Sequence, residues 1–134
     1  MKLVPAAVLL LLLLAAPAMA VDLRPSQALK LLQDFTFTLV TDGEPDLSAR
    51  QLSILLTIYL EPPPHTVRGL AAKLKVTKPV ITRALDTMGK LELVARRRDE
   101  IDRRNVVIQR TPKGALAVER FGDLLIVKAK DLPR

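Results

Sequence analysis

The chain contains no cysteine, one histidine and few aromatic residues. The absence of cysteine among 134 residues excludes disulfide bonds, thiol-based redox sensing and thiolate metal sites. His65 follows three prolines, and no second imidazole exists to help it bind a metal. Phe, Tyr and Trp make up 3% of the residues, too few for the stacking surfaces that single-strand and RNA binders need. We therefore expect no metal and no cofactor.

Sequence motifs for catalysis are also missing. The chain has no Gly-rich phosphate loop, no Ser-His-Asp set and no paired carboxylates placed for a cleft. Asp99, Glu100 and Asp102 lie among arginines, which favours local ion pairs over acid–base chemistry. The sequence predicts that the protein is not an enzyme.

Positive charge is concentrated in one part of the chain. The net charge is +7, and 49% of the residues are apolar, enough for the core of one small domain. Between Arg68 and Lys113 there are thirteen Lys or Arg against five Asp or Glu, a local charge of +8, whereas the remaining residues hold eight against nine. Such a basic segment is typical of a nucleic-acid binder, because neutralising phosphates releases condensed counterions.

Residues 66 to 90 predict two short helices joined by a tight turn. Thr66 can cap the first and Thr77 the second, with Pro79 in the first turn of the second. Each helix repeats apolar residues at i, i+3, i+4 and i+7: Val67, Leu70, Ala71 and Leu74, then Ile81, Ala84, Leu85 and Met88. The outward face near the second N-terminus is then Thr77, Lys78, Pro79, Thr82 and Arg83. A recognition helix offers such residues to base edges in the major groove.

Two β-prone runs follow, at residues 93–98 and 105–110, separated by a charged segment. They predict a hairpin with a basic tip, whose cations are Arg96, Arg97, Arg98, Arg103 and Arg104. A basic helical pair alone is often only a solvated surface. A basic hairpin beside it can follow the phosphates and enter a narrow minor groove, so the whole segment indicates a winged helix-turn-helix that binds duplex DNA.

Helices are predicted on both sides of this segment. Residues 25–40 carry an apolar face formed by Ala28, Leu31, Leu32, Phe35 and Leu39. Ser48 and Gln51 form a capping box for the next helix, which the prolines after Glu61 end. Thr111 and Pro112 start the last helix. The two terminal helices can pack within one chain or join two chains across a two-fold axis.

Three stretches resemble the MarR-type winged-helix transcriptional regulators of bacteria: LSARQLSILLTIYL, TVRGLAAKLKVTKPVITRALDTM and ELVARRRDEIDRRNVVIQRTPKG. The run DEIDRR leading into RTPKG is the most specific part, and the resemblance covers roughly residues 46–122. It implies a mainly α fold with a small β-hairpin, in which a winged helix-turn-helix DNA-binding domain at 46–113 is flanked by dimerisation helices at 21–43 and 111–134. It also implies that Asp102 steadies the wing and that Arg104 reaches the minor groove.

The function implied by the resemblance is sequence-specific regulation of transcription. We expect a repressor that binds an inverted repeat of double-stranded DNA as a homodimer. A small-molecule effector is a further expected partner, but no residue of the sequence identifies its site.

Two positions depart from the family pattern. Glu92 stands where the family has Gly between the recognition helix and the wing, so the left-handed helix cap must form without glycine. Arg110 stands where Leu is frequent, which predicts the loss of one core contact.

Residues 1–20 have the pattern of a signal peptide. Lys2 precedes the apolar run 8–14, and Ala18-Met19-Ala20 satisfies a small-x-small cleavage rule. The segment is a cleaved signal, a membrane anchor, or an artefact of the assigned start, with translation beginning at Met19 or Val21. We favour the last interpretation, which predicts a cytoplasmic protein on the nucleoid. The alternative is an exported or membrane-anchored winged helix that binds proteins rather than DNA.

Overall fold

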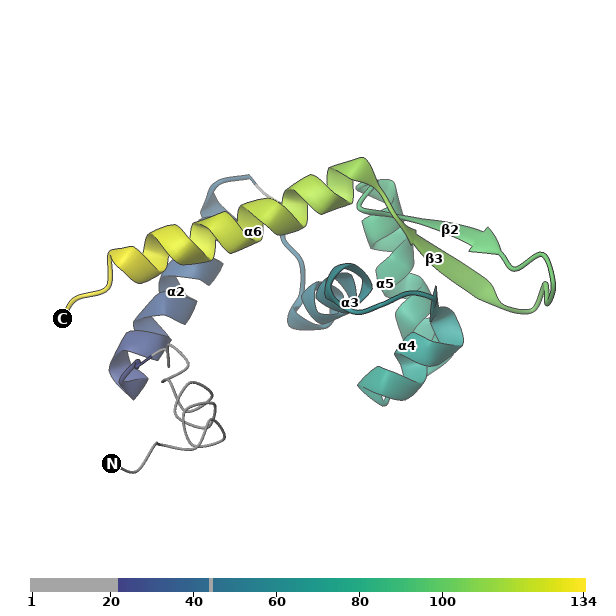
Figure 1. Cartoon of the computed structure of the whole chain (residues 1–134), viewed down its shortest axis with the longest axis horizontal. Helices are drawn as coiled ribbons and strands as arrows, with labels where there is room; N and C mark the ends of the chain where they lie inside the picture. The colour runs from purple at the N-terminus through teal and green to yellow at the C-terminus, as the bar shows by residue number, and fades with distance from the viewer. Residues whose placement is uncertain (1–21, 44) are drawn as a thin grey trace, which may run out of the picture.

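The structure is a computed structural model that describes residues 22–43 and 45–134. Its elements are α2 (Pro25–Thr41), α3 (Ala49–Leu60), β1 (His65–Thr66), α4 (Val67–Leu74), α5 (Lys78–Lys90), β2 (Val94–Arg98), β3 (Val106–Arg110) and α6 (Pro112–Lys130). Figure 1 shows an elongated molecule in which α3, α4, α5 and the strands form a head, and α6 runs from this head to meet α2 at the far end.

The apolar segment predicted at residues 1–20 lies outside the described residues. None of the helices in residues 22–43 and 45–134 combines the length and the apolar character that a membrane span requires.

The head closes around one apolar core. Its largest fully buried side chains come from α3, α5 and the start of the wing: Ile54, Leu55, Ile58, Ile81, Leu85, Met88 and Leu93. The same cluster includes Leu70 and Ala71 of α4, Val94 of β2 and Ile108 of β3. The apolar stripe expected on α5 is therefore buried, whereas the stripe of α4 is buried at Leu70 and Ala71 and partly buried at Val67 and Leu74. The opposite faces of both helices are left to solvent.

Three of the four expected helix caps form as predicted. Thr66 Oγ1 accepts from the Gly69 amide at 2.9 Å, and Thr111 Oγ1 accepts from the Gly114 amide at 2.9 Å. Ser48 and Gln51 make both hydrogen bonds of a capping box. Thr77 occupies the N-cap position of α5, but its side chain makes no capping bond. Thr77 is thus the N-cap residue that the sequence predicted but lacks the side-chain bond, and Pro79 removes one of the two amides that such a side chain can bind.

The sheet has three strands rather than the two of a simple hairpin. Its order is β1-β3-β2 with both pairs antiparallel, and His65 pairs with Ile108. The sequence prediction missed β1 because two residues are too short to show an alternating pattern. The extra strand buries His65, whose Nε2 lies 3.1 Å from the Glu61 carbonyl oxygen.

Glu92 supplies the left-handed cap that glycine makes in the family. Its φ is 60°, its amide donates to the Gly89 carbonyl at 2.9 Å, and the Leu93 amide donates to the Met88 carbonyl at 2.9 Å. These two bonds are those of a Schellman motif. The Glu92 carbonyl accepts from Thr111 Oγ1 at 2.7 Å, and its carboxylate pairs with Lys113 at 3.3 Å. Neighbouring contacts therefore hold a conformation that a glutamate disfavours.

We expect Glu92→Gly to stabilise the protein by about 0.5–1 kcal/mol, because glycine adopts positive φ without a Cβ clash. Urea denaturation measures the change. Lys113→Gln is the matched control, since it removes the exposed ion pair alone and should change stability by less than about 0.5 kcal/mol. A less stable Glu92→Gly variant would show that the position is not strained.

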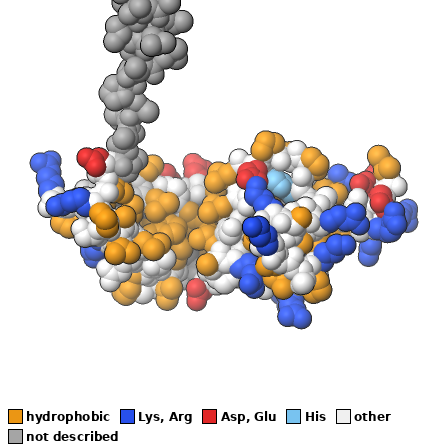
Figure 2. Space-filling model, turned by 90° about the horizontal axis from the view of Figure 1, so that it is seen from below, with side chains coloured by type: hydrophobic (Ala, Val, Ile, Leu, Met, Phe, Trp, Pro, Cys, Tyr) orange, Lys and Arg blue, Asp and Glu red, His pale blue; other side chains and the backbone are white. Residues whose placement is uncertain are grey.

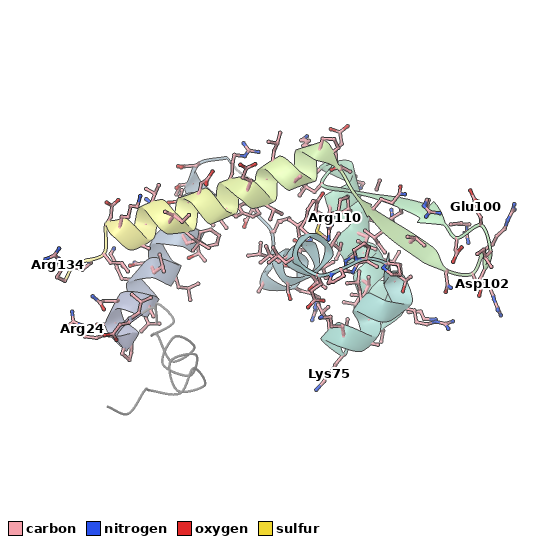
Figure 3. All side chains as sticks on the ribbon, in the orientation of Figure 1. Arg24, Lys75, Glu100, Asp102, Arg110 and Arg134 are labelled. Atoms are coloured by element: carbon pink, nitrogen blue, oxygen red, sulfur yellow. The ribbon has the colours of Figure 1, made fainter. Side chains whose placement is uncertain are left out.

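Arg110, which was predicted to cost one core contact, makes polar contacts with α3 instead. Its Nε donates to the Ile58 carbonyl and its Nη2 to the Glu61 carbonyl, both at 2.8 Å. The guanidinium carbon also lies 5.9 Å from the centroid of the Tyr59 ring. Figure 3 places Arg110 within the head, beside α3. The arginine thus donates to carbonyl groups at the C-terminal end of α3. The last carbonyl groups of a helix have no amide partner within the helix itself.

The far end of the molecule is formed by α2 and α6. Phe35 and Phe121 meet edge to face with ring centroids 6.3 Å apart, and Gln27 Nε2 donates to the Pro133 carbonyl at 3.0 Å. Leu32, predicted on the same inner face as Phe35, is instead 58% exposed in the single chain. Several other large apolar side chains of the two helices are also exposed: Leu29, Phe37, Val40, Leu116, Leu125, Ile126 and Val127.

Candidate nucleic-acid interface

The residues predicted to read DNA form one face of α5. Ile81, Ala84, Leu85 and Met88 point into the core, which turns the opposite side of the helix outward. All five predicted residues are exposed there: Thr77, Lys78, Pro79, Thr82 and Arg83. They occupy the N-cap and the first two turns. A helix in a major groove presents these positions to base edges.

Arg83 lies beside the N-terminus of α3. Together with Ser48, Arg50 and Gln51 it lines a surface hollow of about 210 Å³. The N-terminal end of a helix attracts anions, because its first amides lack intrahelical partners and its dipole is positive there. Arg50 was not predicted from the sequence because it lies outside the basic segment. The Ser48–Gln51 capping box, which predicts the N-terminus of this helix, was the feature of the sequence that could have identified Arg50.

The wing arginines differ in what holds them. Arg96 pairs with Asp86 of α5 at 2.7 Å, so it ties the wing to the recognition helix. Arg98 Nη1 donates to the Arg103 carbonyl at 3.0 Å. Within the described part of the chain, the side chains of Arg97 and Arg103 have no hydrogen-bond or ion-pair partner. The five predicted cations thus comprise two that brace the wing, two that are free, and Arg104 at the tip.

Asp102 organises the tip of the wing. Its Oδ1 accepts from the backbone amide and from Nε of Arg104, both at 3.1 Å. The loop is closed by Asp99 N–H donating to the Asn105 carbonyl at 3.0 Å and Asn105 N–H donating to the Asp102 carbonyl at 2.9 Å. Figure 3 shows Glu100 and Asp102 at the end of the wing farthest from α6. The Arg104 side chain stays 87% exposed, so it remains accessible at the tip.

The acid–base behaviour of Asp102 follows from these contacts. The side-chain hydrogen bond from Arg104, and after it the Arg104 amide, lower the pKa of the Asp102 carboxyl from its usual value of 3.8. A carboxyl with a lowered pKa stabilises the fold above its ordinary pKa, and this contribution is lost as pH falls through the lowered value. The tip should therefore keep one arrangement throughout the neutral range.

We expect the Arg104 amide resonance to be constant from about pH 8 to pH 5 and to shift only below about pH 4. Two-dimensional NMR titration measures this. Asp102→Asn should abolish the acid transition of that resonance, whereas Asp99→Asn, the control in the same loop, should keep it. A transition that survives Asp102→Asn would assign the Arg104 contact to another group.

Charge and apolar surface are separated along the molecule. Figure 2 shows most of the Lys and Arg side chains of the visible face over the head and wing, whereas hydrophobic side chains gather over the α2 half. No cluster of three or more His, Cys, Asp or Glu residues that could hold a metal occurs in residues 22–43 and 45–134.

This arrangement of α3, α4 and α5 with a basic three-stranded sheet defines a winged helix-turn-helix domain. The family model described as MarR family matches residues 47–106. Residues 47–106 therefore match the family that the sequence resembles, and the resemblance expected from the sequence is confirmed over this segment.

Several solved structures have a similar fold. A mutant of S. aureus MepR is 21% identical, with a TM-score of 0.67 and 82% of each chain covered. Another S. aureus MepR mutant, bound to an oligodeoxyribonucleotide, is 22% identical with a TM-score of 0.68, covering 78% of this chain and 74% of that one. The transcriptional repressor CouR, bound to a 23-mer DNA duplex, is 24% identical with a TM-score of 0.63, covering 79% and 72%. No curated protein sequence matches the chain. At these identities the solved structures establish the fold.

Proposed function

We propose that the protein is a sequence-specific transcriptional regulator that binds duplex DNA. The observation that carries the proposal is the exposed N-terminal face of α5 beside a basic wing in a MarR-family domain. DNA is bound to an S. aureus MepR mutant and to CouR in structures of similar fold, which supports the same use of this surface.

The proposed contacts are of two kinds: contacts with base edges, which give sequence specificity, and contacts with the phosphate backbone, which position the protein. On α5, the groups offered to base edges are Thr77, Lys78, Thr82 and Arg83, with Pro79 in van der Waals contact. Arg50 and the N-terminus of α3 would bind a phosphate beside them. Arg97 and Arg103 would bind the backbone, Arg104 would enter the minor groove, and Arg96 and Arg98 would keep the wing in position.

The same proposal includes a homodimer. Leu29, Phe37 and Val40 of α2 are each more than 60% exposed in the single chain, at 67%, 67% and 63%. Apolar residues gathered in this way on two adjacent helices usually mark an association surface. A two-fold axis there would set two α5 helices about one DNA turn apart, on an inverted repeat with half-site centres about 10 base pairs apart. Covering a promoter in this way would repress transcription by excluding polymerase.

An alternative function, binding of other proteins by the head, depends on whether residues 1–20 act as a signal peptide or a membrane anchor. If they direct export or anchor the chain in a membrane, the head would meet proteins rather than the chromosome. N-terminal sequencing of the native protein from its producing cells distinguishes the two. A chain starting at Met19 or residue 21 recovered from the cytoplasm supports the regulator, and a chain starting at Met1 or recovered outside the cytoplasm supports the alternative.

Selection from a random duplex library tests the proposed function. We expect enrichment of an inverted repeat, bound with two chains per duplex by analytical ultracentrifugation. Recovery of unenriched sequence would contradict base reading, and one chain per selected duplex would contradict the dimer.

A further inference from the structure

A single isoleucine lies at the tip of the wing. Ile101 is 97% exposed, more than any other large hydrophobic side chain in residues 22–43 and 45–134. It is also the one uncharged residue between Arg96 and Arg104. Its neighbours Glu100 and Asp102 lie at the outer end of the wing (Figure 3). Ile101 therefore contributes almost nothing to the fold through burial, because nearly all of its surface is in water.

The backbone of the loop holds Ile101 in a defined position. The Ile101 amide donates to Asp99 Oδ1 at 3.0 Å. The amides of Asp99 and Asn105 donate to the carbonyls of Asn105 and Asp102, at 3.0 Å and 2.9 Å. Branching at Cβ also restricts the χ1 angle of isoleucine. Binding through Ile101 would therefore order few groups that are not ordered already.

The charges beside Ile101 favour nucleic acid as its partner. Arg103 is exposed, and the Arg104 side chain is 87% exposed. The minor groove of DNA is about 6 Å wide and has a negative potential. Proteins that enter it combine cations with apolar side chains, isoleucine among them. The tip of the wing carries both kinds of group within one ordered loop.

We propose that Ile101 is a specificity-determining residue, which enters the minor groove beside Arg104 and selects A·T pairs there. This role rests on the proposed DNA-binding function. A G·C pair places the 2-amino group of guanine in the minor groove, whereas an A·T pair presents only acceptors there. An isoleucine laid over the amino group would bury a donor without an acceptor. A·T pairs avoid that cost.

The position of the wing predicts where this preference applies. The tip of the wing and the α2 end of the molecule lie at opposite ends of its long axis (Figure 1). In a dimer joined through α2 and α6, the two tips would therefore lie far from the two-fold axis. The A·T preference should apply to both flanks of the inverted repeat, outside the base pairs that face α5.

The contribution of Ile101 can be separated from that of Arg104. The arginine also favours A·T-rich flanks, because A-tracts have a narrow minor groove with a more negative potential. Loss of a cation that neutralises a phosphate lowers the slope of log affinity against log salt by about 0.9. Loss of an uncharged side chain should leave that slope unchanged.

Three duplexes test the role of Ile101, each with the selected repeat between flanks of A·T, G·C or inosine–cytosine pairs. Inosine lacks the 2-amino group of guanine, so its pair with cytosine resembles A·T in the minor groove. We expect the full chain to bind A·T and inosine–cytosine flanks alike and G·C flanks about tenfold more weakly. Ile101→Ala should reduce this difference to about threefold, without changing the salt slope or the urea midpoint. Ile101→Val should keep the tenfold difference.

Glu100→Gln is the matched control, because Glu100 is the adjacent exposed residue of the tip. It should raise affinity for all three duplexes alike and keep the flank preference. Arg104→Gln, in contrast, should lower the salt slope by about 0.9.

Three results would overturn the role of Ile101 while leaving the proposed function intact. These are a tenfold flank preference that survives Ile101→Ala, an equal loss of affinity for all three duplexes, and binding of inosine–cytosine flanks as weak as that of G·C flanks. Failure of the unmodified chain to bind any duplex would instead contradict the proposed function, and with it the role of Ile101.

Discussion

Replacing Arg83 with alanine is expected to remove the preference for one base pair within each half-site. Arg83 is exposed on the outward face of α5, so the substitution leaves the core intact. A bidentate arginine–guanine contact contributes about 1–3 kcal/mol of discrimination. Affinity for the selected site should fall by about tenfold to a hundredfold, and affinity for random duplex should fall much less. Fluorescence anisotropy with both duplexes measures the two values.

Arg97→Ala is the contrasting variant for Arg83→Ala. It removes a free wing cation, so it should weaken selected and random duplexes alike and lower the salt slope by about one. If Arg83→Ala also weakened both duplexes equally, α5 would be holding the backbone rather than reading bases.

The largest effect on stability is expected at Gly114, in the first turn of α6. A Cβ there would lie 1.9 Å from Tyr59 Oη and 2.1 Å from the Leu93 carbonyl oxygen. Tyr59 cannot move away cheaply, because its hydroxyl donates to Leu93 O at 2.7 Å and accepts from the Thr111 amide at 2.9 Å. These bonds join α3, the start of the wing and α6. Gly114→Ala should cost about 3 kcal/mol or more and lower Tm by about 10 °C or more.

Gly89→Ala is the matched control for Gly114→Ala. Gly89 lies within α5, and a Cβ there would meet no atom within 4 Å apart from its chain neighbours and the backbone of its own helix. Alanine in that helical position should stabilise by about 0.5–1 kcal/mol. Calorimetry on both variants separates the effect of a steric clash from that of helix propensity. Similar Tm values for the two variants would show that a side chain at position 114 causes no serious clash.

The helices were predictable because their signals are local. Ser48, Thr66 and Thr111 each make the capping bond that their position suggests, and apolar spacing identified the buried face of α5. β1 escaped detection because its partner, β3, lies about forty residues further along the chain. Non-local pairing of so short a strand leaves no periodic pattern.

The sequence identified Glu92 and Arg110 as unusual but did not predict the contacts that each residue makes. The sequence indicated that both residues break a family pattern. It could not show that Thr111 and Lys113 would hold Glu92 at positive φ, or that Arg110 would bond α3 carbonyls. These outcomes depend on partners that tertiary packing brings together.

In the candidate site too, some features follow from the local sequence and others depend on tertiary packing. Exposure of the α5 face followed from the spacing of the apolar residues on the other side. The pairing of Arg96 with Asp86, and the approach of Arg50 to Arg83, depend on how the wing and α3 pack against α5. Charge alone therefore identified the basic segment but not which arginines are free.

Binding of double-stranded DNA by the basic head is tested by titrating the purified chain into a fluorescent mixed-sequence duplex between about 50 and 200 mM salt. We predict saturable binding that weakens steeply, with a log–log slope of about −0.9 for each phosphate contacted. Absence of binding at the lowest salt, or an affinity indifferent to salt, would contradict this role of the head.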